Sequence, residues 1–273
     1  FAGGSARVDG VSCTGPEDGP PLTVTIDSVQ SGDFQPGIYP DFVVSGVSVE
    51  GGELGHGALG EFVFKQTDLN PMLDALEAGA GALGDSWFEQ NWRSLIPSFA
   101  GLSLAGLDLD VPNPEQPDSR VQAKVEAFDL SLGNYRDGIP TKLSIKGDGI
   151  EVPLPQDSTD PQVTMLLAAG LEKDNVSFEA TGNWDEAART IAIDTVSFSG
   201  VDLGGMKISG VLGNATPQLF SAKPEVATAA ALALTVKSLD VSLSDNGIGA
   251  IAWPLAAAEE GESDVAAFRL KQA

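Results

Sequence analysis

His56 is the first of the few residues in this chain whose type could support catalysis. It is the only histidine among 273 residues, so a Ser-His-Asp triad would need it as the general base. The segment 55–60 around it (GHGALG) matches the GxGxxG fingerprint of dinucleotide-binding folds. That fingerprint needs a strand before it and a helix after it, whereas the strand-like segment 61–64 follows here. The sequence therefore predicts a glycine-rich surface turn at His56 and no nucleotide or catalytic site.

The acidic residues could serve two functions: they could bind calcium, or they could act in pairs as the acid and base of a hydrolase. Oxygen ligands cluster at 108–110, 157–160, 202 and 245–247, but none has the spaced loop and terminal Glu of an EF-hand, so calcium binding stays open. A pair of carboxylates could hydrolyse glycosides. Among 39 acidic residues, however, such pairs are expected by chance and say little about function. An acid-pair hydrolase is therefore the least favoured function. The lone Cys13 excludes an internal disulfide and, with one His, a zinc set of those residue types. We expect no catalytic residue, no metal and no cofactor, and Cys13 as a partly buried free thiol.

The charge of the chain limits its partners. With 39 acidic and 15 basic residues, the formal net charge is −24. A surface of this sign repels phosphate backbones and anionic lipid headgroups, which opposes nucleic-acid binding and polybasic membrane docking. Apolar residues make up 42% of the chain, so it is not a disordered acidic tail.

The elements that must position these residues are mostly strands. The 32 Gly and 17 Pro favour many turns, and apolar and polar residues alternate between them. Because the links are short, neighbouring strands should be antiparallel. We predict a mainly β fold: an extended, curved antiparallel sheet, a meander of strand-Gly-strand units, with a few short covering helices. The predicted strands are 22–26, 42–49, 61–65, 102–110, 121–132, 141–152, 176–180, 190–198, 206–211 and 235–243, and the predicted helices are 70–78, 85–96, 161–169 and 224–234. A turn is predicted at 182–187, which places Trp184 in it.

We expect one β-rich domain over residues 1–273, with two loosely similar halves at 1–115 and 118–273. The chain begins at Phe1 without a Met, and we expect the native chain to be longer at both ends. No run of about 20 apolar residues is present, so no membrane-spanning helix is predicted.

Several predicted strands are apolar on both faces, as in 42–44, 191–193 and 232–234. A sheet with one wet face should alternate cleanly. Either helices cover the second face, or one face lines a groove for an apolar ligand. The sequence leaves both interpretations open.

A family resemblance rests on the segment 175–243, extended upstream by 137–141 and 51–55. Its pattern resembles a family of uncharacterised alphaproteobacterial envelope proteins, and it is distantly similar to the YdgA-like and AsmA-like periplasmic proteins. The resemblance implies a periplasmic location, a signal or membrane anchor outside this chain, and a role in lipid handling. The residues that carry it are Phe178, Trp184-Asp185-Glu186, Thr190-Ile191-Ala192-Ile193, Val201-Asp202-Leu203-Gly204, Leu212-Gly213-Asn214, Leu219-Phe220, Lys237-Ser238-Leu239-Asp240-Val241 and Asp245-Asn246-Gly247.

We therefore expect a non-enzymatic periplasmic protein that binds or shields an apolar ligand, such as lipid acyl chains, in a concave sheet. The alternative is an envelope structural or assembly protein that docks other proteins through a sheet edge or face. The residues expected to line the groove are Phe178, Ile193, Phe198, Met206 and Ile208.

Overall fold

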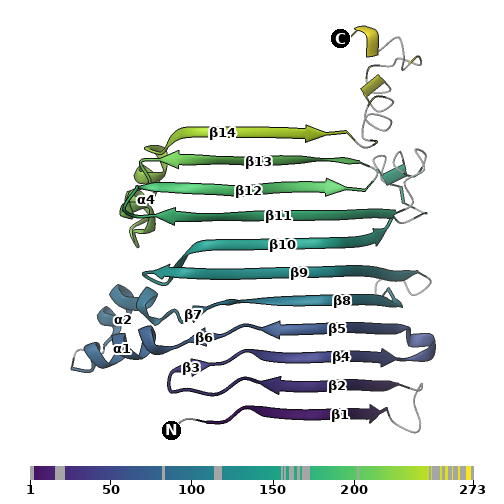
Figure 1. The fold of residues 1–273 in the computed structure, drawn as a ribbon, viewed down its shortest axis with the longest axis horizontal. Coiled ribbons are helices and arrows are strands. Elements are labelled where there is room, and N and C mark those ends of the chain that lie inside the picture. Colours follow the sequence, from purple (N-terminus) through teal and green to yellow (C-terminus); the bar gives the residue numbers. More distant parts are fainter. Residues whose placement is uncertain are drawn as a thin grey trace.

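The fold is one layer of antiparallel strands. The computed structural model describes residues 3–15, 22–81, 84–113, 119–154, 173–201 and 203–245, with isolated positions between 156 and 167 and beyond 246. Eleven strands form an open sheet in the order β1-β2-β4-β5-β8-β9-β10-β11-β12-β13-β14 (Figure 1). Three short strands form a second sheet, β3-β6-β7. The predicted fold class, mainly β with a curved antiparallel sheet and few helices, is confirmed.

The elements have the following bounds, in which η marks a 3-10 helix. The strands of the large sheet are β1 (Ala6–Thr14), β2 (Thr23–Ser31), β4 (Phe42–Glu50), β5 (His56–Phe64), β8 (Gly101–Pro112), β9 (Arg120–Arg136), β10 (Ile139–Pro153), β11 (Lys173–Asp185), β12 (Thr190–Gly200), β13 (Gly204–Gly213) and β14 (Thr235–Ser244). The small sheet has β3 (Ile38–Tyr39), β6 (Thr67–Asp68) and β7 (Ser98–Phe99). The helical elements are η1 (Gly52–Leu54), α1 (Asn70–Gly79), α2 (Asp85–Asn91), η2 (Trp92–Leu95), η3 (Pro217–Phe220) and α4 (Pro224–Leu232).

All ten predicted strands and three of the four predicted helices are present, and most strands are longer than predicted. The helix predicted at 161–169 lies mostly outside the described residues. Two local predictions are wrong. His56 begins β5, because the chain turns earlier, through η1, and Trp184 lies in β11 instead of the turn that follows it.

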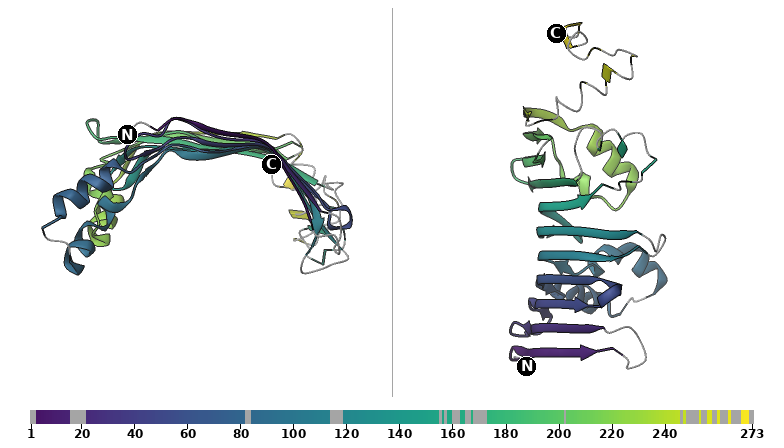
Figure 2. Two further views of the ribbon diagram at one scale, coloured as in Figure 1. Left: turned by 90° about the horizontal axis from the view of Figure 1, so that it is seen from below. Right: turned by 90° about the vertical axis from the view of Figure 1, so that its right-hand side faces the viewer.

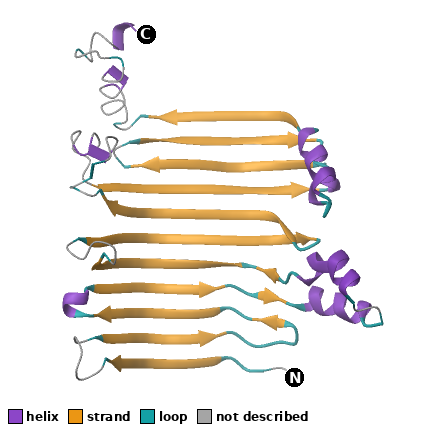
Figure 3. Cartoon of the chain, turned by 180° about the vertical axis from the view of Figure 1, so that it is seen from behind, coloured by secondary structure: helices purple, strands orange, loops and turns teal. Residues whose placement is uncertain are grey.

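The sheet is a trough (Figure 2). Every strand bends in the same sense, so the trough runs across the strands from β1 to β14. At the usual spacing of strands, its eleven strands extend about 48 Å. The helices α1, α2 and α4 lie at one end of the strands on the concave side (Figures 2 and 3).

A row of residues without a paired partner crosses the strands from β1 to β10 where they bend. On alternate strands the row holds a glycine with φ between +56° and +68°, a backbone conformation that L side chains adopt only at a cost. An extra residue at such a position bends the strand, as a β-bulge does. The curvature is thus encoded by glycines. The positive-φ glycines of this row are Gly10 of β1, Gly46 of β4, Gly106 of β8 and Gly149 of β10.

No second layer closes the sheet among the described residues, and the molecule has a large surface as a result. The chain exposes 16,811 Å², whereas a globular protein of 28.1 kDa would expose about 11,100 Å². The apolar side chains that are fully buried among the described residues are Ala215 and Ala257. Cross-strand hydrogen bonds and neighbouring side chains on each face, in place of a core between layers, hold the fold together.

Candidate functional site: the concave face

Four of the five predicted groove residues fall in two adjacent rows on one face of the sheet. Residues directly opposite each other on antiparallel strands share a face. Phe178 of β11 lies opposite Phe198 of β12, which lies opposite Met206 of β13. Ile208, two residues from Met206, lies opposite Val196 in the next row.

Ile193 joins the same face one row further along. It lies opposite Gly182 of β11 and Gly210 of β13, and a register shift separates it from Val196. Ile193 and Val196 line one pocket, which places both side chains on one side of β12. The structure thus brings all five predicted residues to one face, here called the concave face.

The two rows continue through the N-terminal strands. The register carries them from β10 to β1 without a break, and none of their residues is charged. From β14 to β1, the first row is Leu243, Met206, Phe198, Phe178, Gly147, Phe128, Leu104, Phe62, Val44, Val29 and Val8. The second row is Val241, Ile208, Val196, Ala180, Ile145, Leu130, Leu102, Phe64, Phe42, Ser31 and Ala6.

The apolar surface also continues past the glycine row, as the surroundings of Gly147 show. A Cβ on Gly147 would lie 2.6 Å from the ring of Phe178 and 2.9 Å from Cδ1 of Ile150. Gly147 and Ile150 are three residues apart and face the same side, because Gly149 adds one residue to the strand. The absent side chain of Gly147 also leaves room for Phe178, whose ring meets Phe128 edge to face with centroids 6.5 Å apart.

This apolar face is the inner side of the trough. Trp184 lies opposite Ile191, and its ring centroid is 4.6 Å from that of Phe220 in η3. η3 packs beside α4, and α4 lies on the concave side (Figure 2).

The concave face holds an apolar pocket of about 310 Å³ beside η3. The indole Nε1 of Trp184 donates a hydrogen bond to the carbonyl of Ala215 at 2.8 Å, which satisfies the one polar atom of that ring. None of the lining residues that the structure describes carries a charge. They are Pro140, Thr141, Leu143, Ala180, Thr181, Gly182, Asn183, Trp184, Ile191, Ala192, Ile193, Val196 and Phe220.

Beyond the pocket, large apolar side chains lie open to solvent. The exposed fractions are 46% for Phe198 and 40% for Met206. Met206 and Phe198 line a second depression together with Leu243 of β14, which is 78% exposed. The helices therefore cover one end of the concave face, and the strands near β14 stay open.

Arg93 joins the two helical segments that wall this end. Its guanidinium donates hydrogen bonds to the carbonyls of Phe220 and Ser221, the second at 3.1 Å. Arg93 belongs to η2, which contacts α1 and α2. Segments about 130 residues apart in sequence thus form one rim of the trough.

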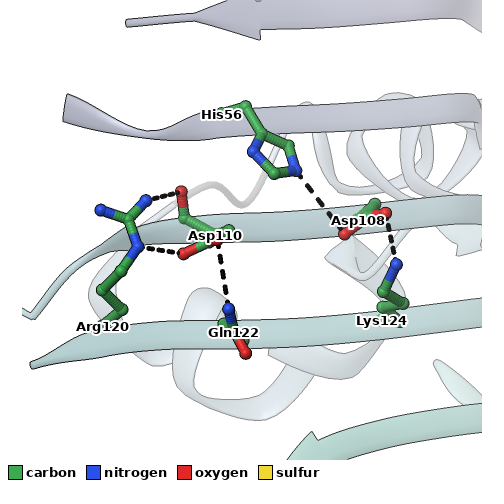
Figure 4. Close-up of polar contacts among 6 residues, drawn as sticks. All are labelled: His56, Asp108, Asp110, Arg120, Gln122 and Lys124. Carbon is green, nitrogen blue, oxygen red and sulfur yellow. Dashed lines mark hydrogen bonds and ion pairs between the residues drawn. The ribbon is translucent and has the colours of Figure 1, made fainter. Parts of the chain in front are cut away.

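The opposite, convex face is polar, and His56 lies on it (Figure 4). His56 Nε2 is 3.9 Å from Asp108 Oδ1, and Lys124 donates a hydrogen bond of 2.7 Å to Asp108. Arg120 Nε donates to Asp110 Oδ1 at 2.5 Å. The hydrogen bond from Arg120 lowers the pKa of Asp110, and the hydrogen bond to Asp108 raises the pKa of Lys124. Basic partners thus occupy these carboxylates, as expected for a stabilising surface network.

Asp129 forms a second convex cluster. It accepts hydrogen bonds from Lys65 Nζ and from Ser131 Oγ, the latter at 2.8 Å. Partial burial tends to raise the pKa of Asp129, but the two hydrogen bonds together with the charges of Lys65 and Lys146 outweigh it, so the net pKa is lowered.

The structure gives no support to metal or hydrolytic chemistry among the residues it describes. No group of three or more His, Cys, Asp or Glu side chains there could hold a metal ion, while Asp157, Asp160, Asp202 and Asn246 of the calcium candidates lie outside the described residues. The pocket beside Trp184 has no carboxylate among its described lining residues. The prediction of a partly buried Cys13 is wrong: the thiol is exposed, because β1 is an edge strand.

Sequence reasoning missed the pocket residues Leu143, Trp184 and Phe220. Trp184 was assigned to a turn, and Phe220 reaches the pocket only because η3 folds back over β11. The signal that could have found Trp184 is its two-residue spacing from Gly182 and Ala180 along β11.

Of the helices that the structure describes, none is long and apolar enough to cross a membrane. Comparison of the chain with models of protein families, with curated proteins and with solved structures finds no match.

Proposed function

We propose that this protein binds or shields lipid acyl chains within the concave face of its sheet. The observation that supports this most is the pair of uncharged rows that cross all eleven strands. Exposed apolar surface costs about 25 cal/mol per Å², and soluble proteins seldom keep a contiguous apolar patch of more than a few hundred Å² unless something binds it. A hydrocarbon chain would cover this surface without leaving any charge unpaired.

The binding is passive burial, without catalysis. The pocket of about 310 Å³ has room for about ten water molecules at their liquid density. Water there would find few hydrogen-bond partners, so its displacement by an apolar group is favourable. The described lining residues offer no acid, base or thiol.

Neither the rows nor the pocket selects a headgroup. In this proposal the headgroup stays outside the trough, and selectivity depends on the length and shape of the chain. The resemblance to periplasmic envelope proteins favours the periplasm as the location, which fractionation of cells that express the native protein would test.

Two measurements on the purified protein test the proposal. Native mass spectrometry should show lipid adducts that disappear after extraction with organic solvent. The delipidated protein should then enhance the fluorescence of N-phenyl-1-naphthylamine, a neutral apolar probe, and oleate should displace the probe. Absence of both adducts and probe binding would refute the proposal.

A role in docking envelope proteins is the second candidate, and the open sheet edges favour it. Val236, Leu239 and Val241 of β14 are 66%, 59% and 55% exposed. A strand added at this edge would cover them and pair the free main chain. This role predicts a protein partner that stays bound after all lipid has been removed.

A further inference from the structure

At the N-terminal edge of the sheet, no strand that the structure describes pairs with the outer side of β1. β1 pairs with β2 on one side only, and all nine of its residues are exposed. The unpaired N–H and C=O groups of such an edge form a template for another strand. Proteins commonly block an edge with Pro or with a charge that points inward, and β1 has no Pro and no charged residue on the concave face.

The two faces of β1 are clearly different. Arg7 and Asp9 lie on the convex face, where Arg7 Nε is 2.7 Å from Asp9 Oδ1. Val8 and Val11 lie on the concave face and are 56% and 40% exposed. Because Gly10 adds one residue between them, these two valines are three residues apart and still face the same side. The concave residues of β1 are Ala6, Val8, Val11 and Cys13, which lie opposite Ser31, Val29, Ile26 and Val24 of β2.

We propose that two copies of this chain pair through β1, antiparallel, about a twofold axis perpendicular to the sheet. Such an axis keeps both concave faces on the same side. The two troughs then join into one sheet of twice eleven strands, about 100 Å long at the usual strand spacing.

The sequence of β1 is self-complementary in one register. With Val8 opposite Val11 of the second copy, Ala6 lies opposite its Cys13, and every concave residue of β1 meets a concave residue. A shift of one residue would place Val8 opposite Gly10 or Ser12 and bring the apolar side chains against the polar face.

The glycine row also continues across this interface. In the proposed register Gly10 lies opposite Asp9 of the second copy. The sheet already contains this combination, because Gly46 faces Asp27 across β4 and β2, and a Cβ on Gly46 would lie 2.0 Å from the Asp27 carboxylate. An acidic residue beside a positive-φ glycine is thus how this sheet builds its bend, and the dimer repeats it.

Charge sets the conditions in which the dimer should form. Each copy carries a formal charge of −24, and the resulting repulsion falls as salt screens it. We therefore expect dimerisation to strengthen between 20 and 300 mM NaCl. A dimer held by charge attraction would weaken over the same range, which would contradict the proposal.

Sedimentation equilibrium of the full chain over a hundredfold range of concentration tests the dimer. We expect a monomer–dimer equilibrium that V8K/V11K shifts to monomer, because both lysines would put charge on the concave face at the junction. The matched control, V241K/L243K, places the same charges on β14 at the far edge and should leave the equilibrium unchanged. A monomer at every concentration, or loss of the dimer in the β14 variant alone, would overturn the proposal.

Cross-linking tests the register. A6C places a thiol opposite the native Cys13 of the second copy, and directly opposite positions lie within disulfide range. Within one chain the two thiols are seven residues apart on an extended strand, roughly 23 Å, and cannot bond. Oxidised A6C should therefore migrate as a covalent dimer, whereas R7C, on the convex face, should not. The reverse pattern would refute the register.

The dimer does not depend on ligand binding. Titration of the parent chain with N-phenyl-1-naphthylamine separates the two ideas, because the pocket over β10, β11 and β12 lies far from β1. Retained probe binding without a dimer in the parent chain refutes only this inference.

Discussion

A charge placed on the concave face should weaken ligand binding at least tenfold, whereas the same charge one residue away should not. Val196 and Ser197 are neighbours in β12 and point to opposite faces. Val196 is 39% exposed on the concave face, and Ser197 lies on the convex face opposite Glu179 and Lys207. The pair V196E and S197E therefore differs only in the face that receives the carboxylate.

The size of the loss follows from what the ligand covers at Val196. Full burial of a Val side chain contributes about 1.5–3 kcal/mol, so covering the exposed 39% contributes about 0.6–1.2 kcal/mol. A glutamate under the ligand must also lose its charge. Protonating it at pH 7 from an ordinary pKa of about 4.3 costs about 3.7 kcal/mol. The lost contact alone gives about a threefold to eightfold loss of affinity, and both effects together set an upper limit of about 4,000-fold.

The assay is titration of delipidated protein with N-phenyl-1-naphthylamine, which is neutral and is not repelled by the new charge. We expect V196E to bind at least tenfold more weakly than the parent chain and S197E to stay within twofold. Circular dichroism and urea denaturation should show both variants folded, since neither position is buried. Equal losses in the two variants, or none in V196E, would refute burial of the ligand on the concave face.

Three further predictions concern the scaffold. G106A should lower the free energy of unfolding, measured in urea, by about 1–2 kcal/mol, because φ at Gly106 is +65° and an alanine there is strained although its Cβ has space. The control is G57A, whose Cβ would make an ordinary 3.5 Å contact with Leu109 and which should not be destabilised. The pKa of Asp129 is lowered in the folded state. Its contribution to stability is therefore present above the unfolded pKa of about 3.9 and is lost as pH falls through the folded-state pKa. D129N should be less stable than the parent chain at pH 7, and the difference in unfolding free energy between the two should shrink below pH 4. R93A removes the hydrogen bonds to the carbonyls of Phe220 and Ser221, so amide hydrogen exchange in η3 and α4 should accelerate. Unchanged exchange in η3 and α4 would show that other contacts hold the rim.

Much of the sheet could be predicted from the sequence because each strand encodes its own alternation. Runs such as 190–198 and 235–243 identify strands without any knowledge of their neighbours, and the short links fix antiparallel pairing. β1 escaped notice because Gly10 breaks its alternation: Val8 and Val11 are spaced by three residues. The three-residue spacing of Val8 and Val11 comes from a bulge between two regular halves of β1. The sequence of a single strand does not reveal such a bulge. The segments 42–44 and 191–193 do carry apolar side chains on both faces, because Val43 and Ala192 alternate with the concave residues on either side of them.

Phe178, Phe198, Met206 and Ile208 share a face through regular alternation and pairing. The register shift between Ile193 and Val196 brings Ile193 to the same face. The pocket could not be predicted, since it depends on two distant events. η3 must fold back so that Phe220 meets Trp184, and Arg93 must reach across to the carbonyls that end η3. Neither event leaves a periodic signal in the sequence.

The charge of −24 also has a structural consequence for this trough. Burying the most apolar surface would require two concave faces to stack, which would bring two strongly acidic sheets within the usual 10 Å separation of packed layers. At physiological salt the screening length is about 8 Å, so much of that repulsion would remain. Pairing through the β1 edge instead keeps the bulk of the two charges tens of ångströms apart. The acid excess of the chain thus opposes closure of the trough by a second copy and leaves the concave face open to a smaller, uncharged occupant.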